Sequence, residues 1–364
     1  MTVGIYTIHA ETNYGAMLQA FATQAFLRRN GIVAEIVNLF TKEDQDRMQY
    51  KLPLNSAKNV AKNFIAIIHP QIRKKIERLQ EFHSSMSLSK RYYFFDEIYR
   101  TPPTYDIHLV GSDQVWNLQK GFNKRNFFFL DFLHDNQCKM SYGSSLGNPN
   151  ISWDLYPKLK ELLFSFKAIS TREAAGVTVL KAVTGKDVAH VVDPTFLLSS
   201  DEWMQQTIPD PLIKGDYILY YGFDKSERCK QMIKTLKEEL KIPVVAVSAN
   251  ITIPYHVDKF CRDAGPREFL NLFRYASYVI TSSFHGMAFA INFRRNFFVM
   301  SHGDRMSRME SLLSSFNIHN RIVGNKEDLL KSYRLQPIID YSESESFIET
   351  QIKKSSDWLL SQLQ

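Results

Sequence analysis

The sequence has few cysteines and no long apolar run, and these two absences exclude several classes of protein. The 364 residues include only three cysteines, Cys138, Cys229 and Cys261. Their wide separation fits neither a zinc knuckle nor a disulfide scaffold, so we expect a reducing compartment. The segment Met1–Ile8 lacks the basic and apolar regions of a signal peptide, and the apolar run Phe64–Ile68 is far shorter than a bilayer-spanning helix. These features predict a cytoplasmic protein.

The glycine motifs that bind nucleotide phosphates are also absent. Neither GxGxxG nor GxxxxGK[ST] occurs, which disfavours dinucleotide and P-loop chemistry. The segment Gly143–Gly147 matches GxSxG, and Asp193 and His285 follow in hydrolase order, but the glycine, asparagine and proline of 147–150 forbid the helix that must follow the serine. The DxD-like segment 44–46 lies in a charged surface region rather than at a strand end, so we predict no metal site.

The excess of positive charge is small and uneven. Lys and Arg number 45 against 38 Asp and Glu, a net charge of +7, and the segment Lys42–Arg91 alone has 11 basic and 5 acidic residues. No nucleic-acid recognition motif accompanies this charge. Apolar residues at helical spacing predict two short amphipathic helices in the segment, divided by Pro70. Its basic face is either a solvated helix surface or a contact for a lipid pyrophosphate carrier or the inner membrane face.

Apolar runs typical of buried strands alternate with helical patterns along the chain. The first three elements, Val3–Ile8, Ala16–Arg29 and Ile32–Phe40, form a βαβ unit and predict a parallel sheet. Further strands are expected at Ile107–Val110, Lys139–Tyr142, Ala168–Thr171, Val188–Val192, Tyr217–Tyr221, Ile242–Val247, Tyr278–Thr281 and Phe297–Met300. Further helices are expected at Lys225–Leu240, Glu268–Tyr275, Ser283–Asn292 and Glu343–Leu363.

Chain length and this alternation predict two α/β domains. We expect an N-terminal Rossmann-like domain at 1–200 with a helical insertion at about 42–91, a C-terminal Rossmann-like domain at 201–340, and a closing helix at 341–364. Polar and glycine-rich clusters directly follow the strands in both halves. Ligands of open parallel sheets bind at the carboxyl ends of the strands, so these clusters predict a cleft between the domains.

His285 is the best placed of the ten histidines. Ser282 or Ser283 can cap the following helix, which puts His285 and Gly286 in its first turn. Free N–H groups and the helix dipole favour an anion there, and the dipole keeps an imidazole neutral or eases the donation of its proton. A structural cap histidine is the alternative.

Other charged side chains also follow strands. Arg172 ends an apolar strand, where it needs either an anionic ligand or a salt bridge to Asp193 or Glu173. Asp113 is either a general base or a turn residue. Four more basic candidates are supported by position alone: Arg305, Arg308, His9 and His302.

In this order, the clusters resemble the bacterial polysaccharide pyruvyl transferase family. The matching segments are Asn13–Ala20, Gly111–Trp116, Ser141–Gly147, Arg172-Glu173, Asp193–Thr195 and Ser283–Gly286. The resemblance implies a glycosyltransferase-B-like fold of two facing Rossmann-like domains. It also implies phosphoenolpyruvate as the donor co-substrate, a sugar diol as the acceptor, and no other cofactor or metal.

The resemblance carries over His285 and Arg172 and, less directly, Arg305 or Arg308, and the chemistry of the reaction and the strand-end positions add the other candidates. His285 is the expected general acid and Asp113 the base or a ligand of the sugar hydroxyl. Donor contacts are expected from Arg172, Arg305, Arg308, Ser283 and Gly286, and acceptor or cleft contacts from Asn13, Tyr14, Gly15, Gln114, Ser144 and Ser145. Many members have arginine where Ser283 stands, so either the donor differs here or another arginine compensates. A sugar-nucleotide glycosyltransferase on the same fold and a non-catalytic carbohydrate-binding protein are the alternatives.

Overall fold

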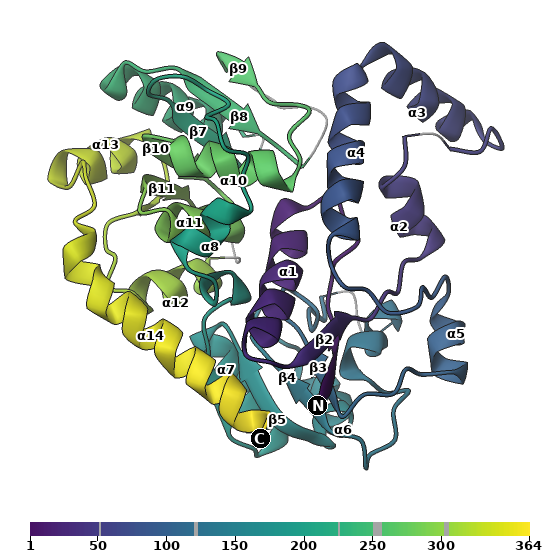
Figure 1. Ribbon diagram of the computed structural model, residues 1–364. Helices are drawn as coiled ribbons and strands as arrows, with labels where there is room; N and C mark the ends of the chain where they lie inside the picture. Colours follow the sequence, from purple (N-terminus) through teal and green to yellow (C-terminus); the bar gives the residue numbers. More distant parts are fainter. Residues whose placement is uncertain (51, 120–122, 225, 250–256, 302–305) are drawn as a thin grey trace.

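Two six-stranded sheets organise the chain (Figure 1). The computed structural model describes residues 1–50, 52–119, 123–224, 226–249, 257–301 and 306–364. The first sheet has the order β2-β1-β3-β4-β5-β6 and the second the order β12-β11-β10-β7-β8-β9. Neighbouring strands in both sheets run parallel. The predicted α/β class, with two Rossmann-like sheets, is confirmed.

The strands are short and mostly buried on both faces, as expected when helices cover both sides of a parallel sheet. Those of the first sheet are β1 Thr2–Tyr6, β2 Val33–Ile36, β3 Ile107–Val110, β4 Lys139–Ser141, β5 Phe166–Thr171 and β6 Val188–His190. Those of the second are β7 Ile218–Tyr221, β8 Val244–Val247, β9 Lys259–Phe260, β10 Tyr278–Thr281, β11 Asn296–Met300 and β12 Ile322–Val323.

The helices between the strands include several that the sequence pattern missed because they are short or weakly amphipathic. In the first half they are α1 Tyr14–Arg29, α2 Lys42–Arg47, α3 Ala57–Ile68, α4 Pro70–Ser84, α5 Phe95–Arg100, α6 Tyr156–Leu163 and α7 Ala174–Thr184. In the second half they are α8 Ser200–Gln205, α9 Glu227–Leu240, α10 Pro266–Tyr275, α11 Phe284–Asn292, α12 Ser307–Ser315, α13 Lys326–Leu335 and α14 Tyr341–Gln362. Within the described residues, no helix is both long and apolar enough to span a bilayer.

The inserted segment contains the two expected amphipathic helices, α3 and α4, and Pro70 begins the second of them. The basic face needs one correction, because Lys75 is not on the surface. Its Nζ donates to the carbonyl oxygens of Ser248 at 2.6 Å and Ala249 at 3.0 Å. Burial lowers the pKa of Lys75 to about 7. Lys75 therefore ties the insertion to the second half of the chain.

The C-terminal helix α14 closes the fold as expected. It runs from the second half of the molecule back to the first sheet (Figure 1). There the Ser355 hydroxyl accepts a hydrogen bond from the backbone N–H of Val192 at 2.9 Å. Arg294 and Glu345 form an ion pair that fastens the start of the helix to the second half. The helix thus bridges the two sheets on the side away from α4.

Candidate active site

Four charged or titratable side chains from strand ends meet in one buried cluster. Asp113 follows β3, Arg172 follows β5, Asp193 follows β6, and His285 lies in the first turn of α11 after β10. Parallel strands put these positions at one edge of each sheet. The first three side chains come from the N-terminal half and His285 from the C-terminal half, so the cluster lies where the two halves meet.

Arg172 is the centre of this cluster. Its Nη1 donates to Asp193 Oδ2 and, at 3.1 Å, to the Ser112 hydroxyl. Its Nη2 donates to Asp113 Oδ1 at 3.2 Å. The Ser112 hydroxyl donates in turn to Asp193 Oδ2 at 2.9 Å. The salt bridge to Asp193 that the sequence left open is present, and Arg172 also bridges to a second carboxylate.

Local backbone conformation aims the two carboxylates. Asp113 has a φ of +69°, in the left-handed region that aspartate tolerates better than most residues. Asp193 begins a short turn in which its Oδ1 accepts from the backbone N–H of Thr195 at 3.0 Å and from the Thr195 hydroxyl at 2.8 Å. Asp193 Oδ2 is thereby left for Arg172, Ser112 and His285.

His285 faces the cluster from α11. Its Nε2 lies 3.8 Å from Asp193 Oδ2, and its ring is held on the other side by Gly15. A Cβ on Gly15 would lie only 2.2 Å from Nδ1 of His285. Position 15 must therefore be glycine for the first turn of α1 to approach the imidazole this closely. The Asn13–Ala20 segment and the histidine motif Ser283–Gly286 therefore contact each other in the fold through Gly15 and His285.

The charges of the cluster shift one another's titration. Burial raises the pKa of Asp193, but the charges of Arg172 and His285 and the hydrogen bonds from Thr195 and Arg172 together outweigh it and bring the pKa to about 2. Burial and Arg172 act on Asp113 in the same opposed way, and its pKa is also lowered. Burial lowers the pKa of His285, and the negative charges of Asp193 and Asp113 offset only part of that effect. Both carboxylates are therefore ionised and the imidazole is neutral at pH 7 in the free protein.

Two nitrogen atoms of the cluster point to a missing partner. Arg172 Nε and His285 Nε2 are both buried, and neither has a hydrogen-bond partner within the described part of the chain. Arg172 also lies over the Phe284 ring, with Cζ 4.4 Å from the ring centroid, which fixes the guanidinium plane. A buried polar atom left unpaired costs about 1–3 kcal/mol, so the pair is a natural site for an oxygen-bearing ligand.

Of the remaining candidates for the site, Ser283 and Arg308 lie at the cluster, and two others lie outside the described residues. Ser283 caps α11, and its hydroxyl accepts from the N–H of Gly286 at 3.4 Å. Arg308 is buried, and its Cζ lies 5.9 Å from the same Phe284 ring that Arg172 covers. Arg305 and His302 lie outside the described residues. Arg308, one of the two arginines proposed from sequence, therefore lies in the cluster.

Three of the expected acceptor residues are buried, and their hydroxyls have hydrogen-bond partners within the protein. The Tyr14 hydroxyl donates to the carbonyl oxygens of Ala264 at 2.8 Å and Ser248 at 3.2 Å, so it joins the two halves. Ser144 and Ser145 are both fully buried. The Ser144 hydroxyl donates to the Gly111 carbonyl at 3.2 Å, and the Ser145 hydroxyl donates to Glu173. The Ser144 and Ser145 hydroxyls thus hold neighbouring strand ends together, and their role as acceptor contacts stays a prediction.

Asn13 and Gln114 lie at the edge of the cluster. The Asn13 side chain caps α1 by accepting from the N–H of Gly15 at 3.0 Å. With its amide oriented so that both ends find partners, Gln114 accepts from Arg308 at 3.2 Å. His9 is stacked on His83, with Nδ1 and Nε2 of the two rings 3.0 Å apart. It belongs to the neighbouring loop and not to the charged cluster.

Sequence reasoning missed Ser112 and Phe284 as parts of the site. Ser112 bridges Arg172 to Asp193, and Phe284 supports both buried arginines. Both residues stand inside the matching segments, next to Asp113 and His285. Their positions were therefore visible in the sequence, but their partners became visible only in the fold.

The model of one protein family, polysaccharide pyruvyl transferase, matches residues 13–304. The chain belongs to this family. The matched residues include the whole cluster from Gly15 to His285, and membership implies a transferase of polysaccharide biosynthesis. Among curated proteins, none matches the chain.

Two solved structures of similar fold are those of UDP-N-acetylglucosamine 2-epimerases. A putative UDP-N-acetylglucosamine 2-epimerase from Listeria monocytogenes has a TM-score of 0.56 at 12% identity and covers 99% of this chain and 94% of its own. The UDP-GlcNAc 2-epimerase from Neisseria meningitidis, bound to UDP-GlcNAc, has a TM-score of 0.55 at 11% identity and covers 100% and 99%. At these identities the likeness shows the fold alone, and it supports the glycosyltransferase-B-like arrangement expected above.

Proposed function

We propose that this pyruvyl transferase uses phosphoenolpyruvate to form a pyruvate ketal on a sugar of a polysaccharide repeat unit. The observation that carries the proposal is the pair of unpartnered buried nitrogens, Arg172 Nε and His285 Nε2. Phosphoenolpyruvate is small and carries a carboxylate and a phosphate, whose oxygens are strong acceptors for such groups. Ser283 supplies no charge, so we assign the compensating positive charge to Arg308, which shares the Phe284 ring with Arg172.

The reaction needs one proton delivered to carbon and two sugar hydroxyls. The protonated imidazole of His285 gives a proton to the methylene carbon of phosphoenolpyruvate, which leaves the neighbouring carbon electrophilic. One sugar hydroxyl adds to that carbon and loses its proton to Asp113. A second hydroxyl of the same sugar then adds as the carbon–oxygen bond to phosphate breaks. Its proton returns to His285, and the proton held by Asp113 passes to the departing phosphate. The products are the cyclic ketal and phosphate.

Donor binding prepares His285 for this role. In the free protein, burial lowers the pKa of His285, which favours the neutral imidazole. An anionic donor placed beside the ring favours the charged form, so the histidine takes up its proton as the donor binds. The pKa of Asp113 is lowered, so its carboxylate is ionised before the reaction and can accept a proton from the sugar hydroxyl.

Thermal unfolding with added ligands tests the donor. We expect phosphoenolpyruvate to raise the melting temperature of the protein and of the His285→Ala variant, with phosphate release lost only in the variant. General acid catalysis contributes about 10²–10⁴-fold, which sets the size of that loss. Stabilisation by UDP- or GDP-sugars and not by phosphoenolpyruvate would favour a glycosyltransferase. Sugar binding without any turnover would favour a carbohydrate-binding protein.

A peripheral membrane contact through α3 is the second part of the proposal. The large apolar side chains on one face of this helix are exposed: Val60 48%, Phe64 60%, Ile67 77% and Ile68 52%. In the sequence, residues 50–76 contain six basic and no acidic residues. An apolar helix face in a basic segment is typical of a helix that lies on an anionic bilayer. Such contact suits an acceptor carried on a lipid pyrophosphate.

Vesicle sedimentation tests this contact. The double variant Phe64→Ser/Ile67→Ser should lose binding to vesicles that contain anionic phosphatidylglycerol, with turnover of a short soluble acceptor unchanged. Leu335 and Ile338 are each 68% exposed in the second half, so Leu335→Ser/Ile338→Ser is the matched control. If the parent protein does not sediment with anionic vesicles, α3 has no membrane role.

A further inference from the structure

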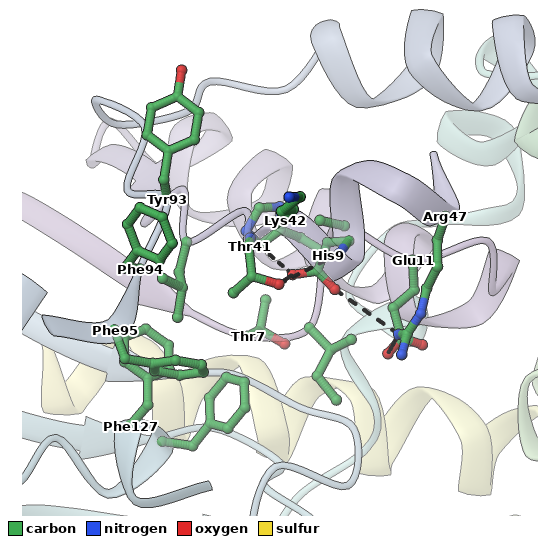
Figure 2. Close-up of a pocket in the computed structure, with 15 residues that line it drawn as sticks. Thr7, His9, Glu11, Thr41, Lys42, Arg47, Tyr93, Phe94, Phe95 and Phe127 are labelled. Carbon is green, nitrogen blue, oxygen red and sulfur yellow. Dashed lines mark hydrogen bonds and ion pairs between the residues drawn. The ribbon is translucent and has the colours of Figure 1, made fainter. Parts of the chain in front are cut away.

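A cavity of about 410 Å³ lies at the carboxyl ends of β1 and β2 (Figure 2). Its volume falls in the range of roughly 300–1,000 Å³ that small-molecule sites have. The lining comes from the loop after β1, from the start of α2 and from two aromatic segments near residues 93–95 and 127–128. The reaction scheme above uses none of these side chains.

The two sides of the cavity differ in chemistry. Tyr93, Phe94, Phe95 and Phe127 gather on one side, and Glu11 and Arg47 face it on the other (Figure 2). Phe94 is 61% exposed and Tyr93 47%, an unusual exposure for large aromatic rings. Arg91 holds Tyr93 in place, with its Cζ 4.6 Å from the ring centroid. The aromatic surface is therefore ordered and open to a ligand.

The polar side offers groups that exchange hydrogen bonds with hydroxyls. Arg47 Nη1 lies 3.6 Å from Glu11 Oε1 and 3.9 Å from Asp44 Oδ1. The Thr41 side chain and Asp44 form the capping box of α2 at the same rim. Carboxylates accept from hydroxyl groups and guanidinium donates to them, so this side suits a ligand with several hydroxyls.

We propose that this cavity binds a pyranose ring of the sugar acceptor. A pyranose has a face of C–H groups, which would lie against Phe94 and Tyr93, and a rim of hydroxyls, which would meet Glu11 and Arg47. The cavity supplies binding and orientation and takes no part in bond making. The binding of a pyranose stands on the lining alone, and its assignment as the acceptor rests on the proposed function.

The position of the cavity fits an acceptor site. Thr7 lines it, and the Thr7 hydroxyl donates to the Ser112 carbonyl at 3.1 Å. Ser112 in turn bonds to Asp193, and its neighbour Asp113 is the proposed base. The contact between Thr7 and Ser112 is thus a common wall of the cavity and the cluster. A saccharide with one ring in the cavity brings its next ring to the edge where Asp113 lies.

Saturation-transfer NMR with methyl glycosides of galactose, mannose and N-acetylglucosamine tests the cavity directly, without donor or turnover. At least one glycoside should bind the parent protein, and Phe94→Ala should weaken that binding at least tenfold. The matched control is Phe164→Ala, because Phe164 is 72% exposed at the C-terminal end of α6 and lies outside the cavity. We expect the control to bind as the parent does.

The outcomes separate this inference from the proposed function. If none of the glycosides binds the parent, or if Phe94→Ala binds as tightly as the parent, the cavity is not a pyranose site. Phosphate release from phosphoenolpyruvate is measured separately with the same variants. For an active acceptor, Phe94→Ala should raise the acceptor KM at least tenfold and leave the KM for phosphoenolpyruvate unchanged. Glycoside binding at Phe94 without any phosphate release would keep the pyranose site and overturn the donor assignment.

Discussion

Gly15→Ala is the substitution that probes the site most selectively, because it adds one methyl group against His285. The new Cβ would lie 2.2 Å from Nδ1 and 2.3 Å from Cγ of the imidazole, where contacts of 3.4–4 Å are ordinary. The Cβ of His285 would also lie only 2.7 Å away, so the whole side chain must move by about 1 Å. Such a displacement of a reacting group costs roughly 10²-fold in rate. We expect phosphate release to fall by about that factor.

The effect on stability should be much smaller. Gly15 is the second residue of α1, and alanine in a helix is favoured over glycine by up to about 1 kcal/mol. Overpacking a buried contact costs about 1–3 kcal/mol, so the two effects largely cancel in the free energy of unfolding. A large loss of turnover with a small loss of stability is thus the expected signature of a displaced imidazole.

The assay pairs initial rates of phosphate release with thermal unfolding of the same preparation. Gly31→Ala is the matched control, since Gly31 has a φ of +75° and nothing within 4 Å of its added Cβ. It should lose about 1 kcal/mol through backbone strain and keep its turnover. Gly15→Ala with the turnover of the parent would refute the idea that this contact sets the position of His285.

Three further predictions concern the charges around His285. Arg172→Ala leaves two buried carboxylates without their cation, so we expect a loss of about 3–5 kcal/mol in a urea titration, and parent-like stability would contradict the network. Asp193 has a pKa of about 2 against an ordinary 3.8, so its ionised form stabilises the fold above pH 4, and this contribution is lost as the pH falls through 2. In calorimetry, Asp193→Asn should make the melting temperature less dependent on pH below pH 4. An unchanged pH dependence would argue against the pairing of Asp193 with Arg172. Burial lowers the pKa of His285, and Asp193 and Asp113 partly restore it, so Asp193→Asn should move the high-pH fall of kcat/KM to lower pH, and a move to higher pH would exclude His285 as the acid.

Much of the fold could be predicted from the sequence because its strands are buried on both faces. Segments such as Ile107–Val110 and Tyr278–Thr281 are short and mostly apolar, and the structure has strands at the same residues. Short helices such as α5 and α8 have six residues each, too few for a helical period to stand out. The two-residue strands β9 and β12 are equally hard to detect, because pairing with neighbours defines them more than composition does.

The sequence was enough to predict most of the residues that form the candidate site, but not which of them contact one another. Polar residues at strand ends pointed to Asp113, Arg172 and His285, since the carboxyl edge of a parallel sheet collects them. The same pattern also selected Ser144 and Ser145, because a hydroxyl that supports a strand end and one that faces a ligand have the same sequence signature. The contact of Gly15 with His285 joins residues far apart in the chain and follows only from the docking of the two halves.

Transfer of labelled pyruvyl carbon from phosphoenolpyruvate to a sugar tests the central claim most directly. The measurement uses a panel of lipid-linked and synthetic galactosides, mannosides and hexosamines, and follows phosphate release and the acid-labile ketal together. We predict that one acceptor class gives both products in equal amounts with the parent protein, and that His285→Ala gives neither. Ketal formation that persists in His285→Ala, or no transfer to any acceptor class by a protein that still binds them, would contradict the account.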